Sequence, residues 1–368
     1  MDFVFDSDDD VDLAALELVV YGIPRQVYAR ADNFNRFNEL SFFQRFRLTK
    51  NTILALLPQI EHHLEFPHDN NQSVSPINQL LLCLRYYATG SHLLAMGDFA
   101  GVHVSTACRI IKKVSHAIAL MYPNYIKMPQ TADEIHRAQE GFFQISAFPR
   151  VIGALDCTHV RIQSPGGEDA EIYRNRKGYF SVNVQAVCNA QLKFFNVVAR
   201  WPGSSHDSTI FNNSHLRAEF EQNIYPNCAI LGDSGYYLRT YLMTPLLEPR
   251  TERQQLYNQS HIRTRNVIER TFGVWKRRFP VLAYGCRLKI ETLLSVIIST
   301  AILHNIAIDN NEGEPPVDAN GDIQLLQQLI RNGQIPVPAI PLHLRNRGAA
   351  ADGARMRDEL INNYFGNL

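Results

Sequence analysis

The sequence predicts an α/β fold in which a helical segment precedes a mixed sheet flanked by helices. Residues 36–149 carry apolar side chains at helical spacing. Residues 150–240 contain runs rich in β-branched residues, one of which alternates between apolar and polar side chains. Residues 262–308 return to helical patterns. The 368 residues are enough for two or three domains, so these changes of pattern mark the expected domain boundaries.

The N-terminal part of the chain divides into an acidic segment and a helical one. Residues 1–35, with their acidic tip, are expected to be loosely ordered. In the helical segment 36–149, Ser41 is expected to cap the first helix. Pro76 is expected to begin the next helix, and Gly90 to close it.

The segment that follows has the spacing of a helix-turn-helix. A short helix is expected up to Ala100, a turn at Gly101, and a second helix near 105–121. A recognition helix needs a buried apolar stripe and a basic face for the major groove, and this segment offers both. A plain helical hairpin in a bundle has the same pattern, so both interpretations stay open. The basic residues expected to contact DNA here are Arg109, Lys112 and Lys113.

The segment 150–240 predicts strands interrupted by one helix. Three consecutive strands, a helix and a further strand of parallel type form the order of ribonuclease H-like folds. We therefore expect a mixed five-stranded sheet flanked by helices. The expected elements are strands in 150–162, 179–190 and 191–201, a helix in 206–222, a short strand from 228 that ends at Asp233, and helices in 262–279 and 291–308.

The charge of the chain is informative through its distribution. Lys plus Arg and Asp plus Glu balance at 36 each, so net charge alone does not indicate a nucleic-acid partner. Between residues 250 and 289, however, ten Lys and Arg stand against two Glu, and residues 99–132 contain no Asp or Glu. Two basic stretches of this kind can form a phosphate-binding face. The alternative is ordinary solvated helix surface.

Several classes of protein are not indicated. No apolar run reaches the roughly 18 residues of a membrane span, and the acidic N-terminus does not resemble a signal peptide, so we expect an intracellular protein without membrane contact. The six cysteines form no CxxC pair, which argues against a zinc knuckle or a disulfide framework. The sequence also lacks the GxSxG and Walker-type motifs of common hydrolases.

Three acidic residues are candidates for a metal site. Two-metal phosphoryl chemistry needs hard oxygen ligands around ions roughly 3.5–4 Å apart. Asp156 and Asp233 each follow a short apolar run, and strand ends fix such ligands in place. Glu269 lies on a predicted helix beside Arg265 and Lys276, which we expect to hold DNA phosphates. The alternative for Glu269 is an i, i+4 surface ion pair.

Five segments, taken in order, resemble the PIF/Harbinger group of DDE transposases. They are GALDCTHVRI, YRNRKGYFSVNVQAVCN, WPGSSHDSTIFNNS, LGDSGYYLRTYLMTP and RNVIERTFGVWKRRFPVL. The resemblance is strong over about 150–305, looser over the helical segment, and hardly extends into the tail. It implies a ribonuclease H-like DDE endonuclease domain at 150–308. The C-terminal extension at 309–368, which contains Pro315 and Pro316, is expected to be a surface extension with one or two short helices.

The resemblance also implies a site and its partners. Asp156, Asp233 and Glu269 would be the catalytic acids, and together with Asp207 they would bind Mg²⁺ or Mn²⁺. Asp207 begins a predicted helix, so N-capping is the alternative for that residue. The implied substrate is double-stranded DNA, with a separate Myb-like DNA-binding protein as partner. The implied location is the nucleus, with the cytoplasm as a second one, and homo-oligomerisation is left open.

Other interpretations remain beside the nuclease. The first is a non-catalytic DNA-binding protein derived from a transposase. The second takes His206 and Asp207 as the core of an HD-type phosphohydrolase, an all-helical fold that the predicted strands disfavour. Further basic residues with a DNA-binding or structural interpretation are Arg174, Arg176, Lys177 and His159.

Overall fold

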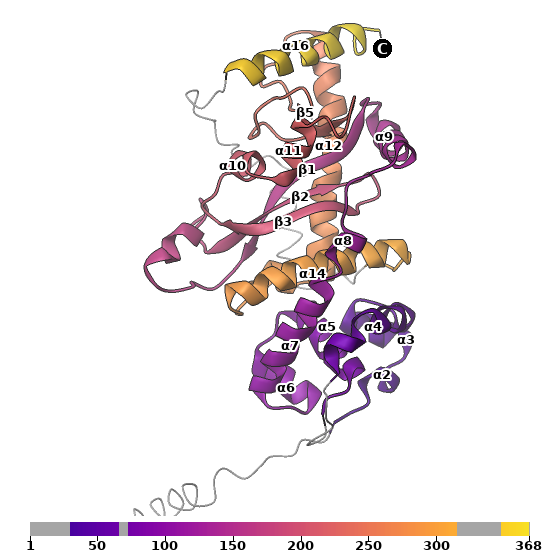
Figure 1. The fold of residues 1–368 in the computed structure, drawn as a ribbon, viewed down its shortest axis with the longest axis vertical. Coiled ribbons are helices and arrows are strands. Elements are labelled where there is room, and N and C mark those ends of the chain that lie inside the picture. The colour runs from indigo at the N-terminus through magenta and orange to yellow at the C-terminus, as the bar shows by residue number, and fades with distance from the viewer. Residues whose placement is uncertain (1–29, 66–72, 315–346, 368) are drawn as a thin grey trace, which may run out of the picture.

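The computed structural model describes residues 30–65, 73–314 and 347–367. A five-stranded sheet lies at the centre, with helices on both faces and a group of helices beyond one edge (Figure 1). The strands are β1 (Val151–Arg161), β2 (Ser181–Cys188), β3 (Phe194–Pro202), β4 (Ala229–Leu231) and β5 (Leu242–Met243). The expected mixed five-stranded sheet is therefore confirmed, although the two-residue β5 was not located from the sequence.

The sheet has the order β3-β2-β1-β4-β5. β1 pairs antiparallel with β2 and parallel with β4, so both pairing directions meet at β1. β2 also pairs antiparallel with β3, and β4 parallel with β5. The alternation predicted for β2 is present, but all eight of its residues are buried. Its polar face therefore lies under other elements instead of facing water.

The N-terminal helices differ in detail from those expected. The structure has two helices where one was predicted, because Arg47 adopts a left-handed conformation (φ 65°) that ends the first of them. Ser41 is not a cap: its N–H donates to Asn38, which caps that helix, and Thr49 caps the next. The elements are α2 (Asn33–Arg36), α3 (Glu39–Phe46), α4 (Lys50–Leu64), α5 (Pro76–Thr89), α6 (Leu93–Ala100), α7 (Val104–Ala119), α8 (Tyr122–Tyr125) and α9 (Ala132–Ser146).

The predictions for α5, α6 and α7 are confirmed at the level of secondary structure. Pro76 begins α5, and Gly90 ends it with φ 62°. Gly101, with φ 61°, separates α6 from α7. The buried stripe of α7 is the expected one, formed by Ile110, Ile111, Val114, Ala117 and Ile118.

The elements around the sheet also depart from prediction at their ends. The helix expected over 206–222 is broken in two, because Ser214 caps a second helix by accepting the N–H of Arg217. The helix expected from 262 begins ten residues earlier, at a capping box made by Thr251 and Gln254. These elements are η1 (Glu168–Tyr173), α10 (Asp207–Asn212), α11 (His215–Glu221), α12 (Glu252–Arg278), α13 (Val281–Tyr284), α14 (Ile290–Asp309) and α16 (Arg347–Asn363).

The longest apolar helix, α14, meets a membrane-span criterion by length and composition, with a mean hydropathy of 1.6, so the expectation that no run is long enough was wrong. Within the described residues it is the single helix that does so, and 67% of that window is buried. It crosses beneath the sheet and contacts both β3 and α7 (Figure 1). This burial is typical of a core helix.

Contacts from the end of the sheet region complete the N-terminal helices. Glu312, just after α14, accepts hydrogen bonds from the Thr49 N–H (3.0 Å) and hydroxyl (2.8 Å) at the start of α4. Buried Arg278, at the end of α12, donates to the carbonyl of Arg47 at 2.9 Å. One hydrophobic cluster accordingly extends from Phe42 to Phe365.

Two expectations concern segments that lie largely outside the described residues. The loosely ordered N-terminus was expected over 1–35, of which only 30–35 are described, and α2 lies partly within them. The tail was expected as a surface extension over 309–368, of which 315–346 lie outside the described residues. Beyond that gap, α16 contacts α12 and β5.

Candidate active site

The parallel pairing of β1 and β4 places Asp156 and Asp233 at the same level of the sheet. Ala154 pairs with Leu231, and each aspartate lies two residues further along its chain. Neighbouring strands are about 4.8 Å apart, so the two segments are adjacent. Asp233 follows the end of β4, as predicted. Asp156 was expected at a strand end, but β1 continues to Arg161. Only the pairing of β1 with β4 ends before Asp156.

Helix α12 brings Glu269 to Asp156 through a shared arginine. Arg265 Nη1 donates to Asp156 Oδ2 at 2.9 Å, and Arg265 Nη2 donates to Glu269 Oε1 at 2.6 Å. The Arg265 and Asp156 side chains are only 15% and 17% exposed. The i, i+4 ion pair considered for Glu269 is therefore present. It is also one half of a bridge from α12 to β1, which an isolated surface pair would not make.

Asp207 approaches from the other face of the sheet. It is the first residue of α10, and its Oδ1 accepts a hydrogen bond from Asn183 Nδ2 at 2.9 Å. Asn183 pairs with His159 of β1. Because side chains alternate along a strand, His159 and Asp156, three residues apart, point to opposite faces of the sheet. The N-cap position of α10 belongs to His206, and no capping hydrogen bond is present there. Asp207 is thus fixed by β2 and does not act as the cap.

The acids form a site in which negative charge exceeds positive charge. Burial raises the pKa of Asp156 to about 7; the Arg265 charge opposes this rise, and the Asp233 and Asp207 charges add to it. Burial also raises the pKa of Asp233, against Arg265 and the Gly235 N–H, with Asp207 and Glu269 raising it further. The charges of Asp207 and Asp233 therefore act on Asp156, those of Asp207 and Glu269 act on Asp233, and the charge of Arg265 opposes both effects.

The donor chemistry of this site fits a divalent metal ion. Four carboxylates offer the hard oxygen ligands that Mg²⁺ and Mn²⁺ prefer. The raised pKa values of Asp156 and Asp233 indicate that added positive charge would be favourable. In the described part of the chain, no three His, Cys, Asp or Glu side chains are already arranged around a metal position. At Asp156 and Glu269, the facing oxygens are instead held by Arg265.

Lys276 lies further along α12 and is directed at β1. Its Nζ donates to Thr158 Oγ1 at 2.7 Å and to the His159 carbonyl at 2.8 Å. Burial lowers the pKa of Lys276 to about 8, with a smaller contribution from Lys177. Arg265 and Lys276 were both expected to hold DNA phosphates. In this structure their charged groups contact the protein, so that expectation does not describe the conformation seen.

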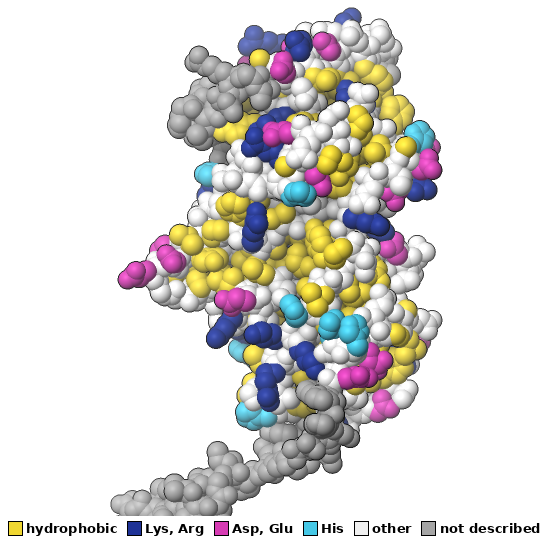
Figure 2. Space-filling model, viewed as in Figure 1, with side chains coloured by type: hydrophobic (Ala, Val, Ile, Leu, Met, Phe, Trp, Pro, Cys, Tyr) yellow, Lys and Arg dark blue, Asp and Glu magenta, His cyan; other side chains and the backbone are white. Residues whose placement is uncertain are grey.

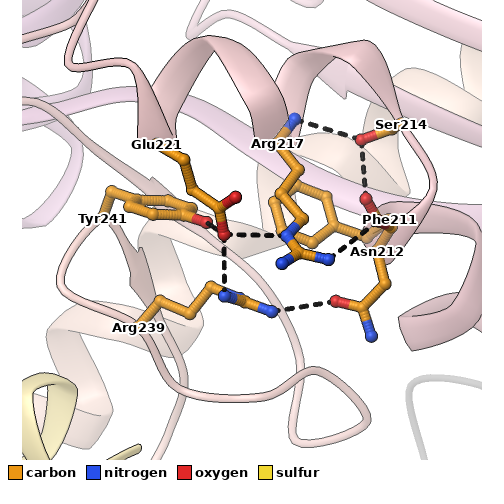
Figure 3. Close-up of polar contacts among 7 residues, drawn as sticks. All are labelled: Phe211, Asn212, Ser214, Arg217, Glu221, Arg239 and Tyr241. Carbon is orange, nitrogen blue, oxygen red and sulfur yellow. Dashed lines mark hydrogen bonds and ion pairs between the residues drawn. The ribbon is translucent and has the colours of Figure 1, made fainter. Parts of the chain in front are cut away.

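A polar network holds together the segments that carry Asp207 and Asp233 (Figure 3). Glu221, the last residue of α11, accepts hydrogen bonds from Arg217 (2.8 Å), Arg239 (3.1 Å) and Tyr241 (3.2 Å). Arg239 also donates to Asn212 Oδ1 at the end of α10 at 3.0 Å. Because α10 begins at Asp207 and the 235–241 loop follows Asp233, this network joins the segments that carry the two acids.

The basic residues of α7 are divided between solvent and protein. Arg109 and Lys112 are exposed. Lys113 instead donates to the Leu64 carbonyl at 2.9 Å, at the C-terminal end of α4. On the face shown in Figure 2, Lys and Arg side chains lie over α6 and α7 among histidines and uncharged groups. Arg109 and Lys112 therefore remain the α7 residues available for a phosphate contact.

Of the remaining basic candidates, His159 lies in β1, and the others lie on the segment between β1 and β2. Arg174 forms an exposed ion pair with Glu171 at 2.7 Å, and Arg176 contacts the His206 ring. Lys177 is exposed. His159 is half-buried against Ser181, and burial lowers its pKa to about 4. The sheet around His206 and Asp207 shows that the all-helical HD-phosphohydrolase interpretation was wrong.

Sequence reasoning missed the residues that position the acids. Asn183 was recognised only as part of a polar alternation, and its contact with Asp207 spans 24 residues of sequence. The available signal was a row of three polar residues on one face of the strand, Ser181, Asn183 and Gln185. A polar face that is buried needs hydrogen-bond partners. The Glu221 network carried no comparable signal, since it joins distant loops.

Comparisons with known proteins agree with these features. A family model described as DDE superfamily endonuclease matches residues 155–305, a range that includes all four acids. The human protein named Putative nuclease HARBI1 is 33% identical over 261 residues, covering 70% of this chain and 74% of its own length. Its mouse counterpart is 33% identical over 316 residues, covering 85% of this chain and 87% of its own.

A plant relative is more distant. The Arabidopsis thaliana protein named Protein ALP1-like is 25% identical over 328 residues, covering 83% of this chain and 80% of its own length. No solved structure matches the chain.

Proposed function

This chain belongs to the PIF/Harbinger-type family of DDE transposases, and we propose that it is a metal-dependent DNA endonuclease with Asp156, Asp233 and Glu269 as its catalytic acids. The observation that carries the proposal is the convergence of β1, the end of β4 and α12 on one buried, negatively charged site. Asp207, fixed by Asn183 on the other side of β1, is the fourth acidic member.

The four acids are the residues that would hold Mg²⁺ or Mn²⁺. Such an ion, when bound, supplies a nucleophilic water and charge stabilisation for phosphodiester cleavage. The chain's own residues provide the positions. Lys276 holds β1 at Thr158, Gly235 orients Asp233 through its N–H at 2.9 Å, and the Glu221 network fixes the loops behind Asp207 and Asp233. Rigid support of this kind is what a catalytic constellation requires.

The wider expectations stand as parts of the same proposal. The strand order β3-β2-β1-β4-β5, with three antiparallel strands first, supports a ribonuclease H-like endonuclease domain at 150–308. The α6–α7 pair, with Arg109 and Lys112 exposed, supports a helix-turn-helix for double-stranded DNA within 36–149. Action on DNA favours the nucleus as the location, with the cytoplasm as a second one. A Myb-like DNA-binding protein is the proposed partner.

Cleavage of a DNA duplex in the presence of Mn²⁺ tests the proposal. The wild-type chain should nick or cut the duplex, and Asp233→Asn should reduce the rate by about 10³-fold or more, since it removes a charged ligand. Asp133→Asn, at an exposed position on α9, is the matched control and should cleave like wild type. Thermal unfolding of all three proteins checks that the loss is not a folding defect.

A second candidate is a DNA-binding protein without catalysis. The Arg265 bridge favours it, because the facing oxygens of Asp156 and Glu269 are already paired. Wild-type chain that binds duplex DNA but leaves it intact in both Mg²⁺ and Mn²⁺ would establish this candidate and reject the nuclease.

A further inference from the structure

Arg265 occupies a distinctive position, because one guanidinium joins two of the proposed catalytic acids. Its two terminal nitrogens donate to different carboxylates, Nη1 to Asp156 and Nη2 to Glu269. The side chain is 15% exposed, so water does little to weaken the two contacts. Burial lowers the pKa of Arg265, but the charges of Asp156, Glu269 and Asp233 outweigh this effect and raise it.

Arg265 holds one oxygen of each of two acids that would bind a metal ion. Asp156 Oδ1 already accepts the Cys157 N–H at 2.8 Å, which leaves Oδ2, the oxygen paired with Arg265, facing α12. Glu269 Oε1 is paired with the same guanidinium. A cation placed between Asp156 and Glu269 would therefore lie against a second positive charge, and like charges at such short range repel strongly.

The charge balance also explains why an arginine is retained there. The charges of Asp207 and Asp233 act on Asp156, those of Asp207 and Glu269 act on Asp233, and burial makes unpaired charges on Asp156 and Asp233 unfavourable. One guanidinium relieves part of that repulsion and fastens α12 to β1. A divalent ion would relieve more of it, and from the same side.

We propose that Arg265 is an exchangeable counter-ion, a positioning residue that holds Asp156 and Glu269 together until a divalent cation takes their oxygens. This inference rests on the proposed metal-dependent function. Once released, the planar guanidinium can bind a phosphate in two-pronged fashion. The phosphate contact expected for Arg265 would then become available only after the metal has entered.

A charge-preserving substitution separates exchange from simple repulsion. Arg265→Lys keeps the positive charge but loses the fork that occupies both acids. In the full chain, Mn²⁺ titration by calorimetry should show at least three-fold tighter binding than in wild type. The melting temperature in EDTA should fall, and Mn²⁺ should restore it. Arg270→Lys, the matched control at an exposed position on the same helix, should bind Mn²⁺ like wild type.

A spectroscopic measurement on the wild-type chain covers the case in which Arg265→Lys does not fold. With ¹⁵N-labelled arginine, the buried and paired Arg265 guanidinium should give slowly exchanging signals in EDTA. Addition of Mg²⁺, which is diamagnetic, should shift these signals and speed their exchange with water. Arginines elsewhere on α12 should be unaffected.

The outcomes distinguish this inference from the function beneath it. If wild type binds the cation while the Arg265 signals stay unchanged, or if Arg265→Lys folds and binds Mn²⁺ no more tightly, the exchange is disproved and the nuclease proposal survives. If neither protein binds a divalent cation, the metal-dependent function fails and the exchange fails with it.

Discussion

Single residues at this site show how backbone geometry sets the position of a charge. Asp233 carries its carboxylate two residues beyond β4, and Gly235 is the residue that stabilises it, through an N–H bond to Oδ1. A Cβ at Gly235 would stand 3.0 Å from that same oxygen. The backbone at Gly235 therefore lies so close to the Asp233 carboxylate that an added side chain would have to displace it.

Gly235→Ala should consequently disturb the site more than the fold. The new methyl group must displace the Asp233 carboxylate by a few tenths of an ångström, and small misplacements of catalytic groups are costly. We expect roughly ten-fold slower Mn²⁺-dependent cleavage with less than about 1 kcal/mol of lost stability. Cleavage kinetics and urea unfolding measure the two effects.

The neighbouring Ser234→Ala is the control for that substitution, because it changes the same loop without approaching the Asp233 oxygens. It should leave both quantities close to wild type. A Gly235→Ala protein with wild-type cleavage would show that the close approach has no functional consequence.

At the scale of elements, α12 and the α10–α11 pair support the site from opposite faces of the sheet. α12 presents Arg265, Glu269 and Lys276 toward β1, while α10 presents Asp207 toward β2. Neither arrangement is local, since each depends on how a helix is attached to the sheet. For α10 and α11 that attachment is the Glu221 network.

Glu221→Gln should loosen this attachment. The neutral amide leaves Arg217 and Arg239 near each other without a shared carboxylate, and hydrogen bonds to charged groups are worth about 1–3 kcal/mol, less at a half-exposed site. We expect a loss of about 1 kcal/mol in urea unfolding and weaker Mn²⁺ binding. Glu219→Gln, on the same helix, is the matched control. Unchanged Mn²⁺ affinity in a destabilised Glu221→Gln protein would limit the network to a structural role.

The elements were predictable where their signal is local. The β1 run and the apolar stripe of α12 were visible in the sequence, and so was the αL glycine after α5. The first ten residues of α12 were missed because they are largely polar, and the capping box at Thr251 and Gln254 was not recognised. The two residues of β5 are too few to give a periodic pattern.

The candidate site divides in the same way. Asp156, Asp233 and Glu269 could be named from residue type, spacing and family resemblance. Their connection through Arg265 could not, since it depends on which rotamer a long side chain adopts between two elements. For Asp207, which begins a predicted helix, N-capping stayed open beside metal binding; the contact with Asn183, made through the fold, shows that β2 holds this side chain.

At the scale of the whole molecule, buried histidines attach the long helices to the sheet. His304 of α14 and His261 of α12 are both fully buried. Each contacts a backbone carbonyl through Nε2, that of Leu192 at 2.7 Å and that of Met243 at 3.0 Å. Burial lowers the pKa of both to about 4, so both are neutral at physiological pH.

Stability should therefore depend on pH through these two residues. Between pH 6.5 and 4 the unfolded chain binds protons at each histidine and the folded chain does not, so stability falls as the pH falls through this window. The shift corresponds to about 3 kcal/mol per histidine. Asp156, with its raised pKa, acts in the opposite direction in the metal-free protein, so the effect is best measured as a difference between variants.

His304→Gln supplies that difference, because glutamine can still donate to the Leu192 carbonyl. Its stability relative to wild type should rise by up to about 3 kcal/mol from pH 6.5 to pH 4, measured by urea unfolding. His215→Gln, at a side chain that is 88% exposed, should show no such trend. Parallel pH profiles for His304→Gln and wild type would contradict the assignment.

The Glu312 contact with α4 has a consequence for how this molecule could have arisen. Thr49, which caps α4, donates to the carboxylate of Glu312, and the Arg47 carbonyl before it accepts a hydrogen bond from Arg278; both partners are encoded after the sheet. A gene segment that carried the first helices alone would specify a fragment lacking these two contacts and part of its core. Exchange of the first helices alone between related genes would therefore break contacts that the later part of the chain supplies.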